Sequence, residues 1–385
     1  MTFNFDEAID RRNSGSIKWK LYPQDVLPMW VADMDFKSPP AILDALHERV
    51  NHGVFGYEMP SEELSKTICA WVDKRYGWKI EPDWIVYLPG LVAGLNLVSR
   101  AYGRVGESAV VLSPVYPPFL SAPVNQGMQC DKVRLKENAN GNAISYEIDY
   151  EAFEKAITPR TSLFIHCHPH NPIGKEWTRE ENTRLAEICI KHNVIICSDE
   201  IHCDLMLGDT KHTPFAALSP EIAEHTITLM APSKTFNVPG LGMSFAVVPS
   251  KQLRARLHQT EQGNLPHVNA LGLAAAQAAY TGCDAWLAEL SAYLTANRDF
   301  LAKYIAENFP KMKLTIPDST YLGFLDCREM GIAGNPYQFF LKNAKVAFND
   351  GATFGPGGDG FVRINLGCTR ATLVETLERM KKALS

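Results

Sequence analysis

The middle of this 385-residue chain alternates short apolar runs with amphipathic segments, and this pattern restricts the fold more than any other feature of the sequence. In segment 179–192, for example, Leu185, Ile188 and Cys189 recur at helical spacing. Near-continuous apolar strands are typical of a parallel sheet that is covered by helices on both faces. The sequence therefore predicts an α/β fold with a mostly parallel sheet. The expected strands are 84–88, 108–112, 162–167, 194–197, 226–230 and 245–248.

The C-terminal third has a different pattern, which indicates a smaller α+β domain. Helical periodicity runs over 283–308, and a final helix is expected over 371–384. Short strand patterns lie between them, at 313–316, 321–326 and 360–365. The first 45 residues show no alternation and are expected to join this part. We therefore predict a large domain over 46–282 and a small domain formed by 1–45 and 283–385.

Composition excludes several classes of protein. A hydrophobic fraction of 46% with 21% charged residues is typical of a globular protein with a large core. The net charge is −5 and no dense basic block occurs, which argues against a nucleic-acid partner. The N-terminus does not resemble a signal peptide, and the weakly charged stretch 262–283 is too polar to span a membrane. Nine scattered cysteines without a CxxC pair are typical of reduced thiols, so we expect a cytoplasmic protein.

Two charged residues follow predicted strands of the large sheet. Asp199 ends the run after 194–197, and Lys234 comes just after 226–230. Ligands of open α/β sheets bind at the carboxyl ends of the strands. A lysine that forms a Schiff base and an acid that pairs with a pyridinium nitrogen are the two groups that pyridoxal phosphate (PLP) chemistry needs. The pair therefore suggests a PLP site, although Asp199 alone is also typical of a helix cap.

A glycine turn at 89–94 leads from the first strand into an apolar helical run. A helix N-terminus presents free N–H groups and a positive dipole end to an anion. The turn is a candidate phosphate site, and the hydroxyl of Ser233 is a further donor beside Lys234. Taken alone, such a turn is more often only a turn.

Other candidates follow the remaining strands. Asn171 lies after 162–167, where its amide suits a ring oxygen, although Asn-Pro is also a common turn. Tyr116 lies in a proline-rich turn and suits either stacking on an aromatic cofactor or packing. Arg363 lies in an alternating strand pattern, where it suits either a carboxylate or an exposed surface.

Three alternating histidines are candidate ligands of a metal ion. His166, His168 and His170 share one face of an extended strand. Nothing in the sequence suggests a fourth ligand, and Pro169 and Pro172 indicate that the strand ends here. We therefore expect no metal.

Taken in order along nearly the whole chain, these motifs resemble fold-type I PLP enzymes of the class I/II aminotransferase superfamily. Segments 30–36 (WVADMDF), 198–202 (SDEIH) and 233–237 (SKTFN) resemble its cystathionine β-lyase branch, the C–S lyases. The resemblance implies a large domain with a seven-stranded, mostly parallel sheet. It also implies PLP as the cofactor and a homodimer with shared active sites.

The resemblance assigns roles to individual residues. Lys234 would form the Schiff base and act as the catalytic base, Asp199 would hold the ring nitrogen, and Tyr116 would stack on the ring. Asn171 and His202 would lie near the ring oxygen. The phosphate would bind the backbone of Val92 and Ala93, the Ser233 hydroxyl and Tyr57 of a neighbouring subunit. The substrate would contact Arg363, through its α-carboxylate, together with Ala32 and Asp33.

The implied reaction is α,β-elimination of cystathionine or a related L-cysteine S-conjugate, which gives pyruvate, ammonia and a thiol. Amino transfer is the alternative, because both reactions begin with removal of the Cα proton. A PLP-holding regulatory protein is a second alternative. Two positions depart from many aminotransferases: His202 stands in place of a tyrosine, and Gly242 in place of an arginine that pairs with the phosphate. The second departure is common in the lyase branch.

Overall fold

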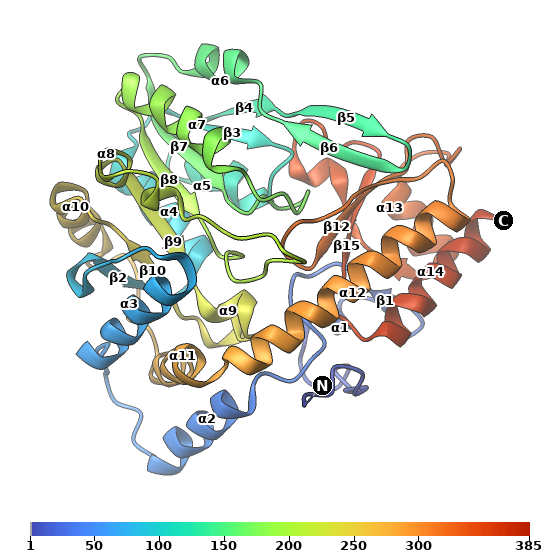
Figure 1. The fold of residues 1–385 in the computed structure, drawn as a ribbon, viewed down its shortest axis with the longest axis horizontal. Helices are drawn as coiled ribbons and strands as arrows, with labels where there is room; N and C mark the ends of the chain where they lie inside the picture. Colours follow the sequence, from blue (N-terminus) through green and yellow to red (C-terminus); the bar gives the residue numbers. More distant parts are fainter. Residues whose placement is uncertain (1) are drawn as a thin grey trace.

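A computed structural model describes residues 2–385, and its main feature is a seven-stranded sheet (Figure 1). Six strands are parallel to one another, and β10 runs antiparallel between β2 and β9. The order is β2 (Ile85–Leu88), β10 (Ser244–Val247), β9 (Thr226–Met230), β8 (Ile195–Asp199), β7 (Thr161–Cys167), β3 (Ser108–Ser113) and β4 (Gln129–Arg134). The predicted α/β class with a mostly parallel sheet is therefore confirmed.

Helices cover both faces of this sheet. Val111 of β3 packs in a core with α4 (Leu91–Tyr102), α5 (Pro117–Asn125) and α10 (Lys251–Glu261). Its neighbour Val110 points the other way, into a core with α6 (Tyr150–Ala156), α7 (Arg179–Lys191) and α8 (Pro220–Glu224). Because successive side chains alternate across a strand, both faces of the sheet are buried. This explains the near-continuous apolar strands of the sequence.

Six strands of the large sheet match the predicted runs within one or two residues at each end. Strand β4 was not predicted, because its residues are mostly charged or polar and partly exposed. As an edge strand it needs no second apolar face. The antiparallel direction of β10 also lies beyond what hydrophobic periodicity can predict.

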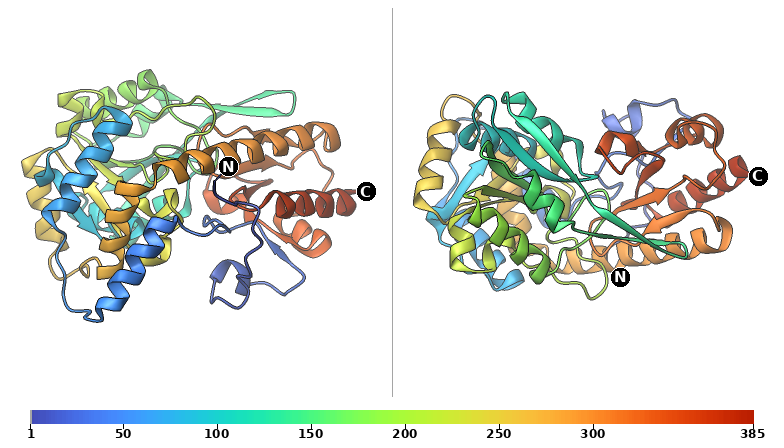
Figure 2. Two further views of the ribbon diagram at one scale, coloured as in Figure 1. Left: turned by 60° about the horizontal axis from the view of Figure 1, so that its bottom comes forward. Right: turned by 90° about the horizontal axis from the view of Figure 1, so that it is seen from above.

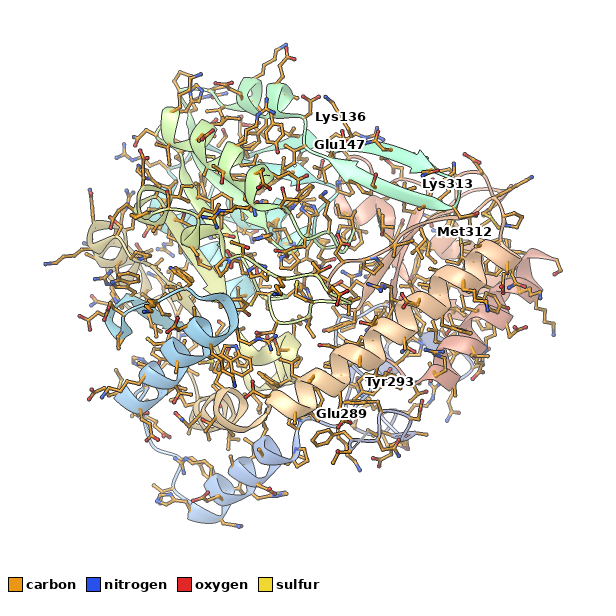
Figure 3. The ribbon with its side chains drawn as sticks, in the orientation of Figure 1. Lys136, Glu147, Glu289, Tyr293, Met312 and Lys313 are labelled. Atoms are coloured by element: carbon orange, nitrogen blue, oxygen red, sulfur yellow. The ribbon has the colours of Figure 1, made fainter. Side chains whose placement is uncertain are left out.

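A second, six-stranded sheet lies beside the first. Its order is β14 (Asn349–Asp350), β15 (Phe361–Asn365), β12 (Leu322–Asp326), β11 (Lys313–Thr315), β6 (Ala143–Glu147) and β5 (Lys136–Asn140). The hairpin β5–β6 comes from the middle of the chain, and Lys136 faces Glu147 at its base (Figure 3). It was not predicted, because it carries few apolar residues. The domain boundaries stay a prediction, since this hairpin joins the second sheet from within 46–282.

The long helix α12 (Asp284–Asn308) runs from the side of the large sheet to the second one (Figure 2). Its side chains hold the N-terminal residues: Glu289 accepts hydrogen bonds from the backbone of Thr2 and Phe3, and Tyr293 bonds to Asp6 (Figure 3). The N-terminal segment thereby lies beside α12, although the bonded residues are 286 or 287 positions apart in sequence. The other helices are α1 (Ile17–Lys20), α2 (Pro40–His52), α3 (Glu62–Tyr76), α9 (Pro232–Thr235), α11 (Ala270–Gly282), α13 (Pro336–Phe339) and α14 (Arg370–Leu384).

Short strands β1 (Leu27–Pro28) and β13 (Val346–Ala347) pair in parallel and join the N-terminal segment to the C-terminal third. Helix α14 begins one residue before its predicted start, where Thr369 caps it through the Thr372 amide. Among the helices of residues 2–385, none has the length and apolar character needed to cross a bilayer.

Candidate active site

A cavity of about 350 Å³ opens at the carboxyl ends of the parallel strands. The turn after β7 carries Asn171 to it, Asp199 is the last residue of β8, and the short helix α9 after β9 carries Lys234. Most of the predicted site residues line this one cavity, although they are far apart in sequence. They are Ala32, Val92, Ala93, Tyr116, Asn171, Asp199, His202, Ser233 and Lys234.

Lys234 lines the cavity and is largely shielded from solvent, with only part of the residue exposed. Its Nζ donates a hydrogen bond to the Ala32 carbonyl oxygen, 2.5 Å away. Burial lowers its pKa to about 8, and the positive charge of Arg363 acts in the same direction. A lysine with a lowered pKa supplies a neutral amine near physiological pH, which is the form that attacks a carbonyl and accepts a proton.

Asp199 is also buried, and its carboxylate accepts a hydrogen bond of 3.1 Å from the Ile201 amide. Within residues 2–385 no basic side chain forms an ion pair with it. Burial raises its pKa to about 7, although the bond from Ile201 opposes the shift. A buried acid without a cationic partner is costly unless a ligand supplies the positive charge. A protonated ring nitrogen is such a group.

Arg363 lies behind Asn171 and does not line the cavity itself. Its Nη1 donates to Asn171 Oδ1 at 3.0 Å, and its Nη2 donates to the Trp30 carbonyl and to Asn349 Oδ1. The amide oxygen of Asn171 is thereby engaged, so its nitrogen is the atom left to donate to a ligand.

No acidic side chain of the described chain neutralises Arg363, and its Nε lacks a hydrogen-bond partner there. Burial lowers its pKa to about 10, yet it stays charged at neutral pH. An unneutralised buried guanidinium suits a carboxylate ligand.

His202 faces the cavity with Nδ1 buried and unpaired within residues 2–385. Burial and the charge of Lys234 lower its pKa well below the usual value, so the ring is neutral. It packs edge-on against Tyr321, whose hydroxyl donates to the Ala32 carbonyl at 2.9 Å. Tyr321 was missed in the sequence, where it only begins an apolar strand pattern.

The N-terminus of α4 forms one wall of the cavity. Gly90 caps it without a side chain, so the amides of the first turn, including Val92 and Ala93, keep free N–H groups. Gly242 stands where many aminotransferases carry an arginine, and the structure gives a reason for the glycine. Its φ is +58°, and a Cβ there would lie 3.1 Å from the Pro89 carbonyl oxygen. This backbone conformation disfavours an arginine at this position.

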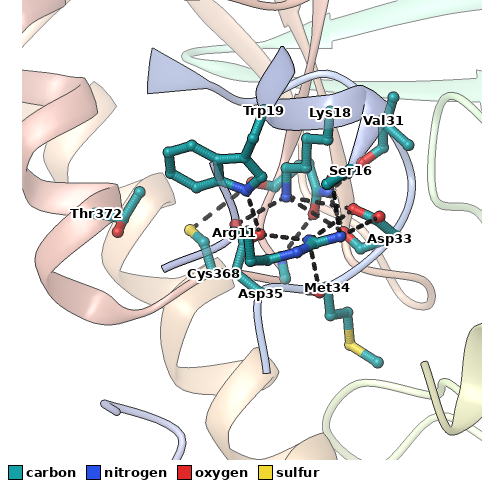
Figure 4. A network of polar contacts seen from close by, with 12 residues as sticks. Arg11, Ser16, Lys18, Trp19, Val31, Asp33, Met34, Asp35, Cys368 and Thr372 are labelled. Atoms are coloured by element: carbon teal, nitrogen blue, oxygen red, sulfur yellow. Dashed lines mark hydrogen bonds and ion pairs between the residues drawn. The ribbon is translucent and has the colours of Figure 1, made fainter. Parts of the chain in front are cut away.

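Asp33 does not reach the cavity in this structure, although it was predicted to contact the substrate. Its carboxylate pairs with Arg11 at 2.7 Å, within a cluster that also holds Lys18 and Asp35 (Figure 4). Asp35 is bonded to Lys18 at 2.8 Å and to the Trp19 indole at 2.9 Å. This cluster holds segment 30–36 in place through side chains that do not line the cavity.

Tyr57 also lies away from the cavity of its own chain. It is fully exposed in a segment that also exposes Val54, Phe55 and Met59. Such a run of exposed apolar side chains is typical of a surface that another chain covers.

The three alternating histidines do not gather around one point. His166 contacts Asn182, His168 contacts the Thr213 carbonyl, and His170 contacts the Pro114 carbonyl. His168 does lie near Glu176 and His212, with ligand atoms within 4.8 Å of one another.

The cavity lysine and the unpaired acid, together with a helix N-terminus at the edge of a mostly parallel sheet, define a fold-type I PLP-dependent enzyme. The chain matches the aminotransferase class I and II family over residues 24–380, and it belongs to that family.

Several known proteins resemble the chain over its whole length. It is 41% identical to the cystathionine β-lyase PatB of Bacillus subtilis, over 99% of this chain and 100% of that protein. A PLP-bound putative aminotransferase from Clostridium difficile matches with a TM-score of 0.96 and 39% identity, over 100% of both chains. A PLP-bound C–S lyase from Staphylococcus hominis matches with a TM-score of 0.93 and 33% identity, over 99% of both chains.

Proposed function

We propose that this chain is a PLP-dependent carbon–sulfur β-lyase that cleaves cystathionine or a related L-cysteine S-conjugate to pyruvate, ammonia and a thiol. The observation that carries the proposal is the end-to-end similarity to a cystathionine β-lyase and a C–S lyase, combined with a cavity that holds Lys234 opposite Asp199. The predicted site residues that line this cavity are of the types that PLP chemistry needs.

Each residue of the cavity would have its own role in holding the cofactor or in moving a proton. PLP, when bound, supplies an electron sink for the negative charge that develops at the substrate Cα. Lys234 would hold the cofactor, then remove the Cα proton with a neutral Nζ, as its lowered pKa favours. Asp199 would keep the ring nitrogen protonated. Asn171 Nδ2 would donate a hydrogen bond to the ring oxygen, and His202 would lie near the same oxygen. Tyr116 would stack on the ring.

The remaining predicted contacts would hold the phosphate and the substrate. Free amides at Val92 and Ala93, with the Ser233 hydroxyl, suit the phosphate. Arg363 would bind the α-carboxylate and so aim the Cα–H bond at Lys234. Ala32 would contact the substrate through its position in the cavity wall, whereas Asp33 would act through segment 30–36.

We also propose that the enzyme is a cytoplasmic homodimer. The exposed apolar segment around Tyr57 supports a subunit interface, and Tyr57 would reach the phosphate of the neighbouring site. The absence of disulfides among the nine cysteines of residues 2–385 is in keeping with a reducing compartment.

The test is a product assay on the purified enzyme with cystathionine and no keto acid. We expect stoichiometric pyruvate and free thiol, and we expect Lys234→Ala to abolish both. Amino transfer that depends on added keto acid, with no pyruvate, would contradict the proposal. S-alkyl cysteines of increasing size in the same assay would rank the sulfur substrates.

A further inference from the structure

A buried histidine outside the cavity, His212, lies between two carboxylates. Its Nδ1 is 3.0 Å from Glu176 Oε1, and its Nε2 is 2.9 Å from Glu200 Oε2. A carboxylate at each nitrogen requires both to carry hydrogen, so the ring is an imidazolium. Burial opposes this charge, but the pairing with Glu176 and Glu200 outweighs burial and raises the pKa of His212 to about 10.

The two carboxylates belong to different loops. Glu176 lies in the loop after β7, five residues beyond Asn171. Glu200 directly follows Asp199 at the end of β8 and precedes the turn that carries His202. Glu200 is itself fixed, since its Oε1 accepts hydrogen bonds from the Ser198 hydroxyl at 2.8 Å and from the Phe215 amide at 2.9 Å.

The loop that carries His212 is attached at the same point. The Thr213 amide donates to Glu176 Oε1 at 3.4 Å, and the Thr213 carbonyl lies 3.1 Å from His168 Nε2. The other titratable rings against His212 are His168 and Tyr76, with centroids at 4.5 and 5.4 Å. None of these groups lines the cavity.

Stability alone is a weak reason for this arrangement. A triad of two carboxylates and one imidazolium keeps a net negative charge in the core, where well-packed apolar residues are often as stable or more so. The triad does, however, connect the Asn171 loop to the Asp199–His202 loop. These loops carry three of the four side chains predicted to contact the ring of the cofactor, namely Asn171, Asp199 and His202.

We propose that His212 is a positioning residue whose bridge from Glu176 to Glu200 fixes the spacing of Asn171 relative to Asp199 and His202, and thereby sets the affinity for PLP. This inference rests on the proposed cofactor site, and it assigns a role to residues that do not touch the cofactor. The negative charge of Glu200 beside Asp199 also favours a protonated ring nitrogen. Loss of the bridge should therefore change the absorbance of bound PLP as well as its affinity.

The test compares His212→Gln with Thr161→Val. Glutamine removes the charge and can contact only one carboxylate at a time. Thr161→Val removes a buried hydroxyl contact with Ser108 at the opposite end of the sheet, so it controls for general destabilisation. The readouts are the dissociation constant from titration of the cofactor-free protein with PLP, and the pH midpoint of the bound-cofactor absorbance.

For His212→Gln we expect a dissociation constant higher on the order of tenfold, with a shifted pH midpoint. Thr161→Val should change neither. If His212→Gln is recovered unfolded by circular dichroism, Glu176→Gln is judged by the same criteria, because it detaches only the Asn171 loop. Unchanged affinity and midpoint in the folded variant would overturn the inference, as would equal weakening in Thr161→Val. Neither readout depends on the reaction, so failure of the lyase assay is a separate result.

Discussion

At Asp199 the fold buries a carboxyl group that forms no ion pair with any basic side chain of residues 2–385. Burial raises its pKa to about 7, well above the unfolded value near 3.8. An acid whose pKa is higher in the folded state destabilises that state as pH rises from the unfolded pKa through the folded one. Asp199 therefore lowers the stability of the cofactor-free protein, and its buried carboxylate attracts a cationic ligand.

The first prediction follows from this cost. Asp199→Asn should stabilise the cofactor-free protein at pH 8 by roughly 1–3 kcal/mol, and by less at pH 5. The same variant should bind PLP more weakly, because the neutral amide cannot hold a protonated ring nitrogen. Urea unfolding at the two pH values measures the first effect. An equal change in stability at both values would contradict the assigned burial.

The second prediction concerns Lys234. Its pKa of about 8 means that the neutral amine forms near physiological pH, whereas an ordinary lysine does so near 10.4. The rate of PLP incorporation into the cofactor-free protein should rise from pH 6 and level off between about pH 8 and 9. Absorbance stopped-flow gives this profile. A rate that still rises steeply to pH 10 would show an unperturbed lysine.

At the scale of elements, segment 30–36 is held in place by two sets of contacts, hydrogen bonds from asparagine side chains and a buried ion pair. Asn365 Nδ2 donates to the Val31 and Asp33 carbonyls, and Asn237 binds the backbone of Met34 from both its oxygen and its nitrogen. The buried pair of Lys18 and Asp35 also anchors the segment (Figure 4). Burial opposes ionisation of Asp35, but the charges of Lys18 and Arg11 and the hydrogen bonds from Lys18 and Trp19 together outweigh burial and lower the pKa of Asp35.

The third prediction tests this anchor. Lys18→Met leaves Asp35 with less compensation in a buried place and should cost roughly 3–5 kcal/mol of unfolding free energy. Lys37→Met is a matched control, since Lys37 pairs with Glu7 on the exposed surface, where such pairs contribute about 0–1 kcal/mol. Thermal unfolding of both variants measures the difference. Equal losses would mean that the cluster does not anchor the segment.

The arrangement of the elements explains which parts of the fold and of the site could be predicted from the sequence. The apolar strands, the turns after them and the residues Lys234, Asp199 and Asn171 were predictable, because parallel strands bring their carboxyl ends to one edge. Tyr321 and the triad around His212 were not, since each forms through contacts between segments with no shared periodicity. The hairpin β5–β6 was missed for a similar reason: it pairs with β11, distant in sequence, and only Ile144 and Tyr146 of its strands are buried in the core, which is too few to give an apolar run.

At the scale of the whole molecule, the proposed dimer makes a prediction that no single chain can fulfil. If Tyr57 serves the neighbouring site, mixing Lys234→Ala and Tyr57→Ala subunits creates heterodimers in which one site carries both changes and the other carries neither. In an equal mixture about a quarter of all sites are then intact. We expect lyase activity in the refolded mixture well above the sum of the two separate variants. Activity equal to that sum would place Tyr57 outside the partner's site.

In the proposed enzyme, PLP is held by Lys234 in the cavity that also contains Asp199. Borohydride reduction of the enzyme with its cofactor, followed by digestion and peptide mass spectrometry, tests this most directly. We expect one phosphopyridoxyl group per chain, carried by the peptide that contains Lys234. A label on another lysine, or no label in an enzyme that forms pyruvate, would contradict it.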